Sequence, residues 1–334
     1  MYPINLTNIY PLQNYKQSLN TCRTNVPNDK NSLRFKGHVG VEELKVLKDK
    51  QLLIQETKLF REYETLKKIC SCLSDFPKHP RIVVGACSTG EEAFSLNMLT
   101  QNLNPEIIGF DIGKRAIQQA QTSTVILAKP KAAKDEHMVN LCRIKAYDDN
   151  FLGFDKKNLT KIEQEQKDLF NASFEEVELP KKTFREKLKD YLDKTLFSDY
   201  IVELDKKAFK IKEEKNNCLF FEGNILNTDK IISNNSVSCF TFRNALYHIL
   251  TTNISGTHRY HLNEQKGEAL MTRIAENVNK ALCKNGIFVL GETEHKQGTN
   301  MDLVCNTLKK TGFIEHPDNT NKIYCNIWKK VEDV

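Results

Sequence analysis

A short apolar run that passes through small residues into a helix constrains the fold of this chain more than any other feature. Residues 81–86 read Arg-Ile-Val-Val-Gly-Ala, which is typical of a buried strand. Cys-Ser-Thr-Gly follows at 87–90, and a helical pattern then runs from Glu91 to about Gln101. Open α/β sheets bind nucleotides at such small-residue turns, because small side chains let the backbone approach a ligand. We therefore expect a strand, a ligand-binding turn and a helix.

The residues that open this helix exclude one class of ligand. A phosphate cradle needs the pattern Gly-x-x-x-x-Gly-Lys-Ser, whereas Glu91 and Glu92 stand at the start of the helix here. Carboxylates at a helix amino end repel phosphate and favour a cation. A nucleoside triphosphate is therefore excluded. The same two glutamates are equally explained as residues that complement the helix dipole.

The rest of the chain alternates between strand and helix patterns. Short apolar strands separated by helices predict a mainly parallel sheet that is covered on both faces. The last two segments are expected to form an antiparallel pair. In chain order, the predicted elements after the first unit are a strand at 107–111, a helix at 114–122, strands at 219–222 and 236–242, a helix at 264–283, and strands at 286–291, 312–316 and 322–328.

Asp111 ends the second of the predicted strands. An acidic residue at this place typically accepts hydrogen bonds from ribose hydroxyls, although Asp is also a common helix cap. Together with the first turn, it favours an adenosine-containing ligand that carries no pyrophosphate. S-adenosylmethionine fits these conditions, since it offers a ribose to one carboxylate, an ammonium to another, and a sulfonium in place of phosphates.

The run from Arg81 to Ser95 resembles the first motif of the CheR chemotaxis receptor methyltransferases, which reads Ala-Cys-Ser-Thr-Gly-Glu-Glu-Pro-Tyr-Ser. Most class I methyltransferases carry a Gly-x-Gly-x-Gly variant at this place. The likeness continues in order from about residue 52 to 328, interrupted by one large insertion. The other similar segments are Gln-Glu-Thr-Lys-Leu-Phe-Arg-Glu at 55–62, Gly-Phe-Asp-Ile at 109–112, Gly-Asn-Ile-Leu at 223–226, Phe-Arg-Asn-Ala-Leu at 242–246, Gly-Glu-Thr-Glu at 291–294 and Ile-Tyr at 323–324.

The resemblance implies an α/β fold of the class I methyltransferase type, a doubly wound sheet that is mostly parallel with an antiparallel last strand. We expect residues 1–38 to form a poorly ordered tail, 39–75 a short helical segment, and 76–334 an S-adenosylmethionine-binding domain. An inserted helical and β-subdomain is expected at 126–218. Within it, 126–196 has helical spacing, and three strands between 199 and 222 are separated by turns at Asp205 and Asn216–Asn217.

The resemblance also assigns residues to the cofactor site. Arg61 offers a planar fork to the methionine carboxylate, and Thr57 lies four residues before it, so that both face one ligand if the segment is helical. Glu91 accepts from the ammonium and Asp111 from the ribose. Asn224 and Asn244 are expected to bind adenine or to position the substrate, unless they serve local backbone. The complete expected set is Gln55, Thr57, Arg61, Ala86, Cys87, Ser88, Glu91, Asp111, Asn224, Ile225, Asn244 and Ala245.

The activity that the resemblance implies is transfer of a methyl group to a glutamate of a chemoreceptor-like protein, with S-adenosylhomocysteine as the product. A glutamate is ionised at neutral pH, because its reference pKa is about 4.3, so no general base is needed. Arg243 and Tyr247 are the expected catalytic residues, although Arg243 is equally explained as a structural ion-pair partner. The family's late His is Glu292 here, and its Tyr falls near His248 or Tyr247.

Composition supports a protein of the cytoplasm. Hydrophobic residues make up 40% of the chain, no apolar run is long enough for a membrane, and the ten cysteines include no Cys-x-x-Cys pair. The net charge of +6 is scattered, so no nucleic-acid partner is expected. We expect a monomer. No metal is expected, because His258 and His261 have no carboxylate at ligand spacing. Two alternatives remain: methylation of another protein or a small molecule, and a non-catalytic cofactor-binding module.

Overall fold

The computed structural model describes residues 58–76, 79–130, 159–179, 204–253, 259–261, 264–292, 294–297, 299–319, 321 and 323–331. The predicted tail at 1–38 and the first part of the predicted helical segment lie outside these residues, as do Gln55 and Thr57. The parts of the insertion at 131–158 and 180–203 also lie outside them.

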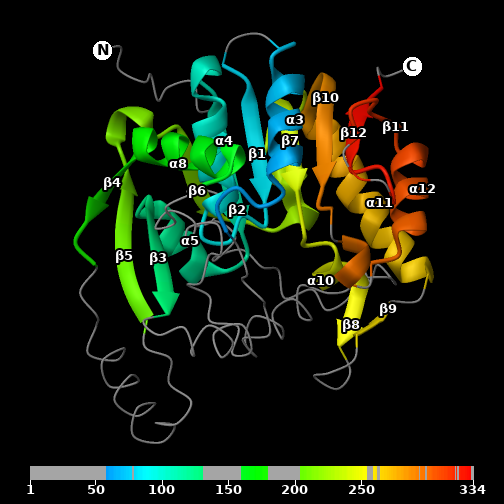
Figure 1. Ribbon diagram of the computed structural model, residues 1–334. Coiled ribbons are helices and arrows are strands. Elements are labelled where there is room, and N and C mark those ends of the chain that lie inside the picture. Colours follow the sequence, from blue (N-terminus) through cyan, green and yellow to red (C-terminus); the bar gives the residue numbers. More distant parts are fainter. Residues whose placement is uncertain are drawn as a thin grey trace, which may run out of the picture. The chain divides into compact units, whose positions relative to one another are not determined.

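The main sheet has the strand order β11-β12-β10-β7-β1-β2-β6 (Figure 1). β1 pairs with β7 in parallel, as do β7 with β10 and β2 with β6, whereas β12 is antiparallel to both β10 and β11. This arrangement confirms the predicted class I methyltransferase-like fold. The strands are β1 (Arg81–Gly85), β2 (Glu106–Asp111), β6 (Cys218–Glu222), β7 (Val237–Phe242), β10 (Leu282–Leu290), β11 (Phe313–Glu315) and β12 (Ile327–Lys330).

The order of the strands reverses at β1. Along the chain, β2 and β6 follow on one side of β1, and β7 and β10 then follow on its other side. Ligands of open α/β sheets bind outside the carboxyl ends of the strands at such a switch point. The turn that follows β1 is therefore placed where the sequence predicts a ligand.

The chain divides into two compact units. The first contains 81–86 and 223–334 and has an apolar core around β7, all of whose residues are buried. Phe240 and Phe288 meet at 6.0 Å between ring centroids, and Trp328 is fully buried. Its other elements are η6 (Ile225–Lys230), α10 (Tyr247–Leu250), β8 (Thr251–Asn253), β9 (Arg259–His261), α11 (Glu264–Ala281), η7 (Glu294–Gln297) and α12 (Met301–Lys310).

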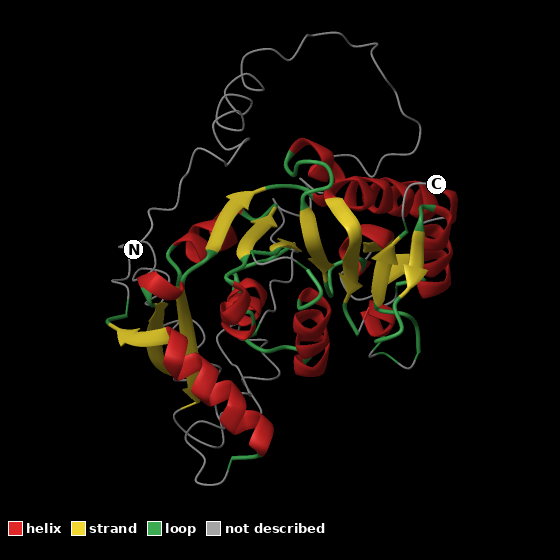
Figure 2. Ribbon diagram, turned by 90° about the horizontal axis from the view of Figure 1, so that it is seen from above, coloured by secondary structure: helices red, strands yellow, loops and turns green. Residues whose placement is uncertain are grey.

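The second unit contains 54–80 and 87–222. Besides β2 and β6 it holds a small antiparallel sheet of order β3-β5-β4. Figure 2 shows the red helix α8 crossing the yellow strands of this small sheet. Its other elements are α3 (Tyr63–Leu73), α4 (Glu91–Leu99), η2 (Gln101–Leu103), α5 (Lys114–Gln121), β3 (Thr124–Pro130), α8 (Lys161–Ser173), β4 (Phe174–Val177), β5 (Leu204–Ile211) and η5 (Glu213–Lys215).

Several local expectations in the insertion were wrong. Residues 124–130 form β3 and not the start of a helical stretch, and Asp205 lies inside β5 and not at a turn. The strand at 218–222 pairs with β2, which confirms the main-sheet strand predicted at 219–222 and corrects its alternative placement among the three strands of the small subdomain. Pairing explains these differences, because β3 is hydrogen-bonded to β5 along its whole length, and tertiary pairing overrides local composition.

Two differences lie near the end of the chain. The last strand begins at Ile327 rather than at Lys322, and residues 301–310 form α12, a helix that is not among the predicted elements. Asn300 caps α12, since its side-chain oxygen accepts from the Leu303 amide at 3.1 Å. Among the described helices, none combines the length and the apolar character that crossing a bilayer requires.

The insertion contributes to the core of its unit. Phe170 of α8 stacks on Phe174 of β4 at 4.7 Å between ring centroids, and Phe174 meets Phe94 of α4 edge-on at 6.0 Å. All three side chains are at most 4% exposed. The insertion therefore packs directly against the helix that follows the predicted ligand-binding turn.

Candidate functional site

The turn after β1 has a left-handed backbone at alternate residues. The φ angles are 53° at Ala86, 51° at Ser88 and 96° at Gly90. For non-glycine residues this conformation costs about 1–2 kcal/mol each. Two hydrogen bonds hold the turn: the Cys87 amide donates to the Phe110 carbonyl at 3.0 Å, and the Gly90 amide donates to the Cys87 carbonyl at 2.9 Å. Enforced strain of this kind gathers at ligand sites.

The Asp111 side chain connects this turn to the end of β2 by hydrogen bonds. Its Oδ2 accepts from the Ser88 amide at 2.9 Å, and its Oδ1 accepts from the Gly113 amide at 2.6 Å. A carboxylate oxygen can accept more than one hydrogen bond, so Asp111 is of the residue type that a ribose requires. Asp111 thus shapes the turn at the place where a ribose is expected.

Glu91 and Glu92 make the start of α4 negatively charged. The Thr89 hydroxyl donates to the Glu91 carboxylate at 2.7 Å, which fixes that side chain beside the turn. Because the carboxylates oppose the positive end of the helix dipole, the helix start favours a cationic group over a phosphate. This is the electrostatic character that the sequence predicts.

Cys87 and Ser88 are both buried in the turn, at 2% and 8% exposure. Burial raises the pKa of the Cys87 thiol well above its ordinary value, and the nearby Asp111 and Glu91 carboxylates raise it further. Cys87 is therefore a neutral thiol that packs rather than a nucleophile. Within the described part of the chain, the Ser88 Oγ has no hydrogen-bond partner, so this hydroxyl is available to a ligand.

Phe220 of β6 supports the turn, and the sequence did not reveal it. It lies opposite Gly109 in the register of β2 and β6, and a Cβ added at Gly109 would be only 2.6 Å from its ring. A Cβ at Gly90 would be 3.0 Å from the same ring, which also meets Phe94 at 5.4 Å between centroids. The two glycines are needed because one phenyl ring fills the space beside both.

Arg61 lies in a turn and not in a helix. α3 begins only at Tyr63, and Phe60 and Glu62 have φ angles of 56° and 54°. The predicted helical spacing of Thr57 and Arg61 therefore does not apply. The Phe60 amide donates to the Ser95 hydroxyl of α4 at 2.8 Å, which brings the Arg61 turn beside α4.

Asn224 and Ile225 follow β6 and lie at the start of the segment 223–334, which belongs to the first unit. The Asn224 side-chain oxygen accepts from the Leu226 amide at 2.9 Å and caps η6. Arg273 of α11 donates from Nε to the Leu226 carbonyl at 2.9 Å, which holds this segment against the helix. The side-chain oxygen of Asn224 thus has the local backbone role that the sequence left open, while Ile225 is buried at 5% exposure.

Asn244 and Ala245 form a second left-handed turn, after β7. Asn244 has a φ of 55°. A Cβ added at Gly291 would lie 2.5 Å from the backbone nitrogen of Asn244. The Ala245 amide donates to Oε1 of Glu294 at 2.9 Å, and Glu294 is fully buried. The sequence does not predict Glu294 as a functional residue, because its contact with Ala245 joins positions that are 49 residues apart.

The two expected catalytic residues flank this turn. Arg243 is 6% exposed and Tyr247 is 8% exposed. The Tyr247 ring lies 4.0 Å from that of His248, measured between centroids. Their role in catalysis remains a prediction.

The expected residues that the structure describes fall into two groups. Arg61, Cys87, Ser88, Glu91 and Asp111 belong to the second unit, where hydrogen bonds connect their segments. The other group belongs to the first unit and comprises Ala86, Asn224, Ile225, Arg243, Asn244, Ala245 and Tyr247.

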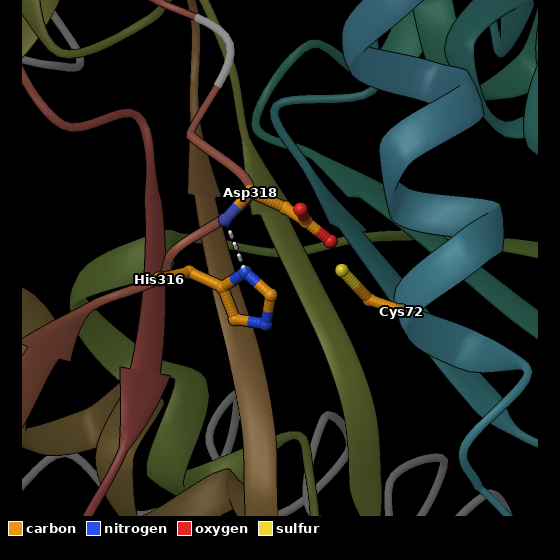
Figure 3. A group of neighbouring side chains, drawn as sticks. All are labelled: Cys72, His316 and Asp318. Carbon is orange, nitrogen blue, oxygen red and sulfur yellow. Dashed lines mark hydrogen bonds between the residues drawn. The ribbon is translucent and has the colours of Figure 1, made fainter.

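One histidine outside these groups has a fixed ring. Figure 3 shows His316, just after β11, whose Nδ1 accepts from the Asp318 amide at 3.1 Å. The figure also draws Cys72 of α3, which belongs to the other unit and is 7% exposed. The hydrogen bond occupies Nδ1 of His316 within its own turn.

No family model matches this chain, and no curated protein matches it. Among solved structures it is similar to a phosphoethanolamine N-methyltransferase 2 of Haemonchus contortus, with 9% identity over 75% of this chain and 37% of that one and a TM-score of 0.34. It is also similar to the CurJ carbon methyltransferase, with 11% identity, coverages of 80% and 53%, and a TM-score of 0.37. A third similar structure is a TehB-like SAM-dependent methyltransferase of Corynebacterium glutamicum, with 8% identity over 78% of this chain and 84% of that one and a TM-score of 0.35.

The chain thus spans about half or less of the length of the first two of these proteins. All three likenesses are weak, and the fold assignment rests on the strand order and direction of the main sheet. Together, this sheet and the strained turn that Asp111 fastens define a class I methyltransferase-like fold with a candidate ligand site after β1.

Proposed function

We propose that this protein is an S-adenosylmethionine-dependent methyltransferase. The observation that carries the proposal is the strained turn at 86–90, whose Ser88 amide is held by Asp111 at 2.9 Å. The turn lies at the switch point of the sheet, where a ligand is expected. The Asp111 carboxylate is the proposed acceptor for the ribose hydroxyls, and the buried Ser88 hydroxyl is available beside it.

The charges around the turn favour this cofactor over other adenosine ligands. Glu91 and Glu92 oppose a phosphate at the start of α4, whereas an ammonium and a sulfonium are both cations. Arg61 supplies a guanidinium for the carboxylate of the same ligand. In this assignment the second unit holds the amino-acid part and the ribose of S-adenosylmethionine.

We further propose that the methyl acceptor is a glutamate carboxylate of a chemoreceptor-like protein, on the strength of the CheR resemblance at 81–95 and 242–246. The carboxylate oxygen attacks the methyl carbon while the bond from that carbon to sulfur breaks. The products are a methyl ester and S-adenosylhomocysteine, and no proton is transferred. Catalysis then comes from alignment of oxygen, carbon and sulfur, with Arg243 and Tyr247 assigned to the acceptor side.

A second candidate is favoured by the burial of those two side chains. Arg243 and Tyr247 are more than nine-tenths buried, which favours packing roles for both of them. In that case the same cofactor site serves another protein or a small molecule, or binds the cofactor without catalysis.

Transfer of a labelled methyl group distinguishes these candidates. The purified chain is incubated with methyl-labelled S-adenosylmethionine and a chemoreceptor cytoplasmic fragment, and the label on protein is measured before and after mild base. Label that base releases supports a glutamyl ester. Base-stable label, or label on small molecules alone, rejects the glutamate acceptor and favours the second candidate.

A further inference from the structure

The hydroxyl of Ser95 joins two segments that are far apart in the sequence. Ser95 is fully buried on α4. Its Oγ donates to the Glu91 carbonyl at 2.7 Å and accepts from the Phe60 amide at 2.8 Å. One oxygen atom therefore connects the turn at 59–62 with the first turn of α4.

The segment that Ser95 reaches needs support from its surroundings. Phe60 and Glu62 have left-handed backbones, which non-glycine residues keep only where neighbouring structure enforces them. Phe60 is also buried at 2% exposure, so its amide would be a costly unsatisfied donor without the Ser95 hydroxyl. Arg61 stands between the two left-handed residues, and the direction in which its side chain leaves the backbone depends on this turn.

S-adenosylmethionine and S-adenosylhomocysteine carry their ammonium and carboxylate on one carbon atom. Protein groups that bind both charges must therefore be held close together and in a fixed relation. We propose that Ser95 is a positioning residue for the amino-acid end of the cofactor, because it joins the turn that carries Arg61 to the helix that begins at Glu91. This role rests on the proposed function, since it concerns one half of the same ligand.

Thr100 provides a matched control at the carboxyl end of the same helix, where it is the capping residue. It is also fully buried, and its hydroxyl donates to the Leu96 carbonyl at 2.6 Å, which is the same four-residue spacing as that from Ser95 to Glu91. Thr100→Val removes this bond and keeps the shape of the side chain. It therefore tests loss of a buried helix hydroxyl without loss of the Phe60 contact.

The test compares two ligands in calorimetric titrations of the full chain. S-adenosylhomocysteine contains the amino-acid group, and 5′-methylthioadenosine lacks it while keeping the adenosine. Ser95→Ala is expected to weaken S-adenosylhomocysteine binding by about tenfold, with the 5′-methylthioadenosine affinity within about twofold. Thr100→Val is expected to leave both affinities within about twofold. Equal weakening of both ligands by Ser95→Ala overturns the positioning role.

A double-mutant cycle with Arg61→Ala asks whether Ser95 acts through Arg61. If it does, adding Ser95→Ala to Arg61→Ala weakens S-adenosylhomocysteine binding by less than about twofold more. Fully additive losses overturn the proposal.

If Ser95→Ala does not fold, hydrogen exchange on the wild-type chain decides instead. S-adenosylhomocysteine should slow exchange of the Phe60 amide, and an equal effect of 5′-methylthioadenosine overturns the positioning role. If the wild-type chain binds 5′-methylthioadenosine but not S-adenosylhomocysteine, the positioning role of Ser95 is overturned and the adenosine site stands. If it binds neither ligand, the proposed function is rejected as well.

Discussion

Replacing Asp111 tests how far one carboxylate supports the proposed cofactor site. Asp111→Ala removes the acceptor for the Ser88 amide at 2.9 Å, the acceptor for the Gly113 amide at 2.6 Å and the proposed ribose contact. Loss of a hydrogen bond to a charged group costs about 1.5–3 kcal/mol. Loss of the ribose contact alone should therefore weaken S-adenosylhomocysteine binding by about ten- to 150-fold.

The turn adds to this effect, because its left-handed residues lose part of the support that holds them. Asp111→Asn keeps one oxygen acceptor and should weaken binding less than Asp111→Ala does. Calorimetric titration of both variants measures the order. Glu175→Ala is the control, since Glu175 is an exposed carboxylate of the same unit, on β4. Unchanged affinity in Asp111→Ala would refute both the ribose contact and the proposed role of Asp111 in shaping the turn.

Three further predictions concern packing and the turn. Gly109→Ala places a Cβ against the Phe220 ring and should lower the free energy of unfolding by about 1–3 kcal/mol, as measured by urea denaturation; an unchanged midpoint would show that the ring is not fixed. Phe170→Ala should cost about 3–5 kcal/mol, whereas Ile162→Ala, at an exposed position of the same helix, should stay within about 0.5 kcal/mol; equal small effects would mean that α8 is not part of the core. The raised pKa of Cys87 predicts that iodoacetamide at pH 8 modifies this thiol only after unfolding, and mass spectrometry showing rapid modification of the native chain would contradict its burial.

The Phe170 prediction has a counterpart for the whole insertion. If the insertion were separable from the cofactor site, deleting residues 130–190 would spare cofactor binding. Phe170 and Phe174 instead pack with Phe94, on the helix that follows the turn. The deletion should therefore destabilise the unit that holds Asp111 and Glu91.

The parts of the site that could be predicted are local in sequence. The strand, turn and helix at 81–99 follow each other directly, and Asp111 was assigned because it ends the next strand. Residue types and their order are enough for such features, since neighbouring elements of an α/β sheet bring them together. The sheet itself was predicted for the same reason.

The parts that were missed depend on contacts between distant residues. Ser95 meets Phe60 across 35 positions, and Glu294 meets Ala245 across 49. Phe220 could be assigned beside Gly109 only once the register of β2 and β6 was known. β3 was misassigned for a similar reason, because its partner β5 lies far along the chain.

The most direct test of the central claim is a calorimetric titration of the wild-type chain with S-adenosylhomocysteine. The proposed site predicts one-to-one binding in the micromolar range, corresponding to about 8 kcal/mol, that is weakened at least tenfold by Asp111→Ala. Absence of binding would contradict the claim that the turn after β1 is a cofactor site.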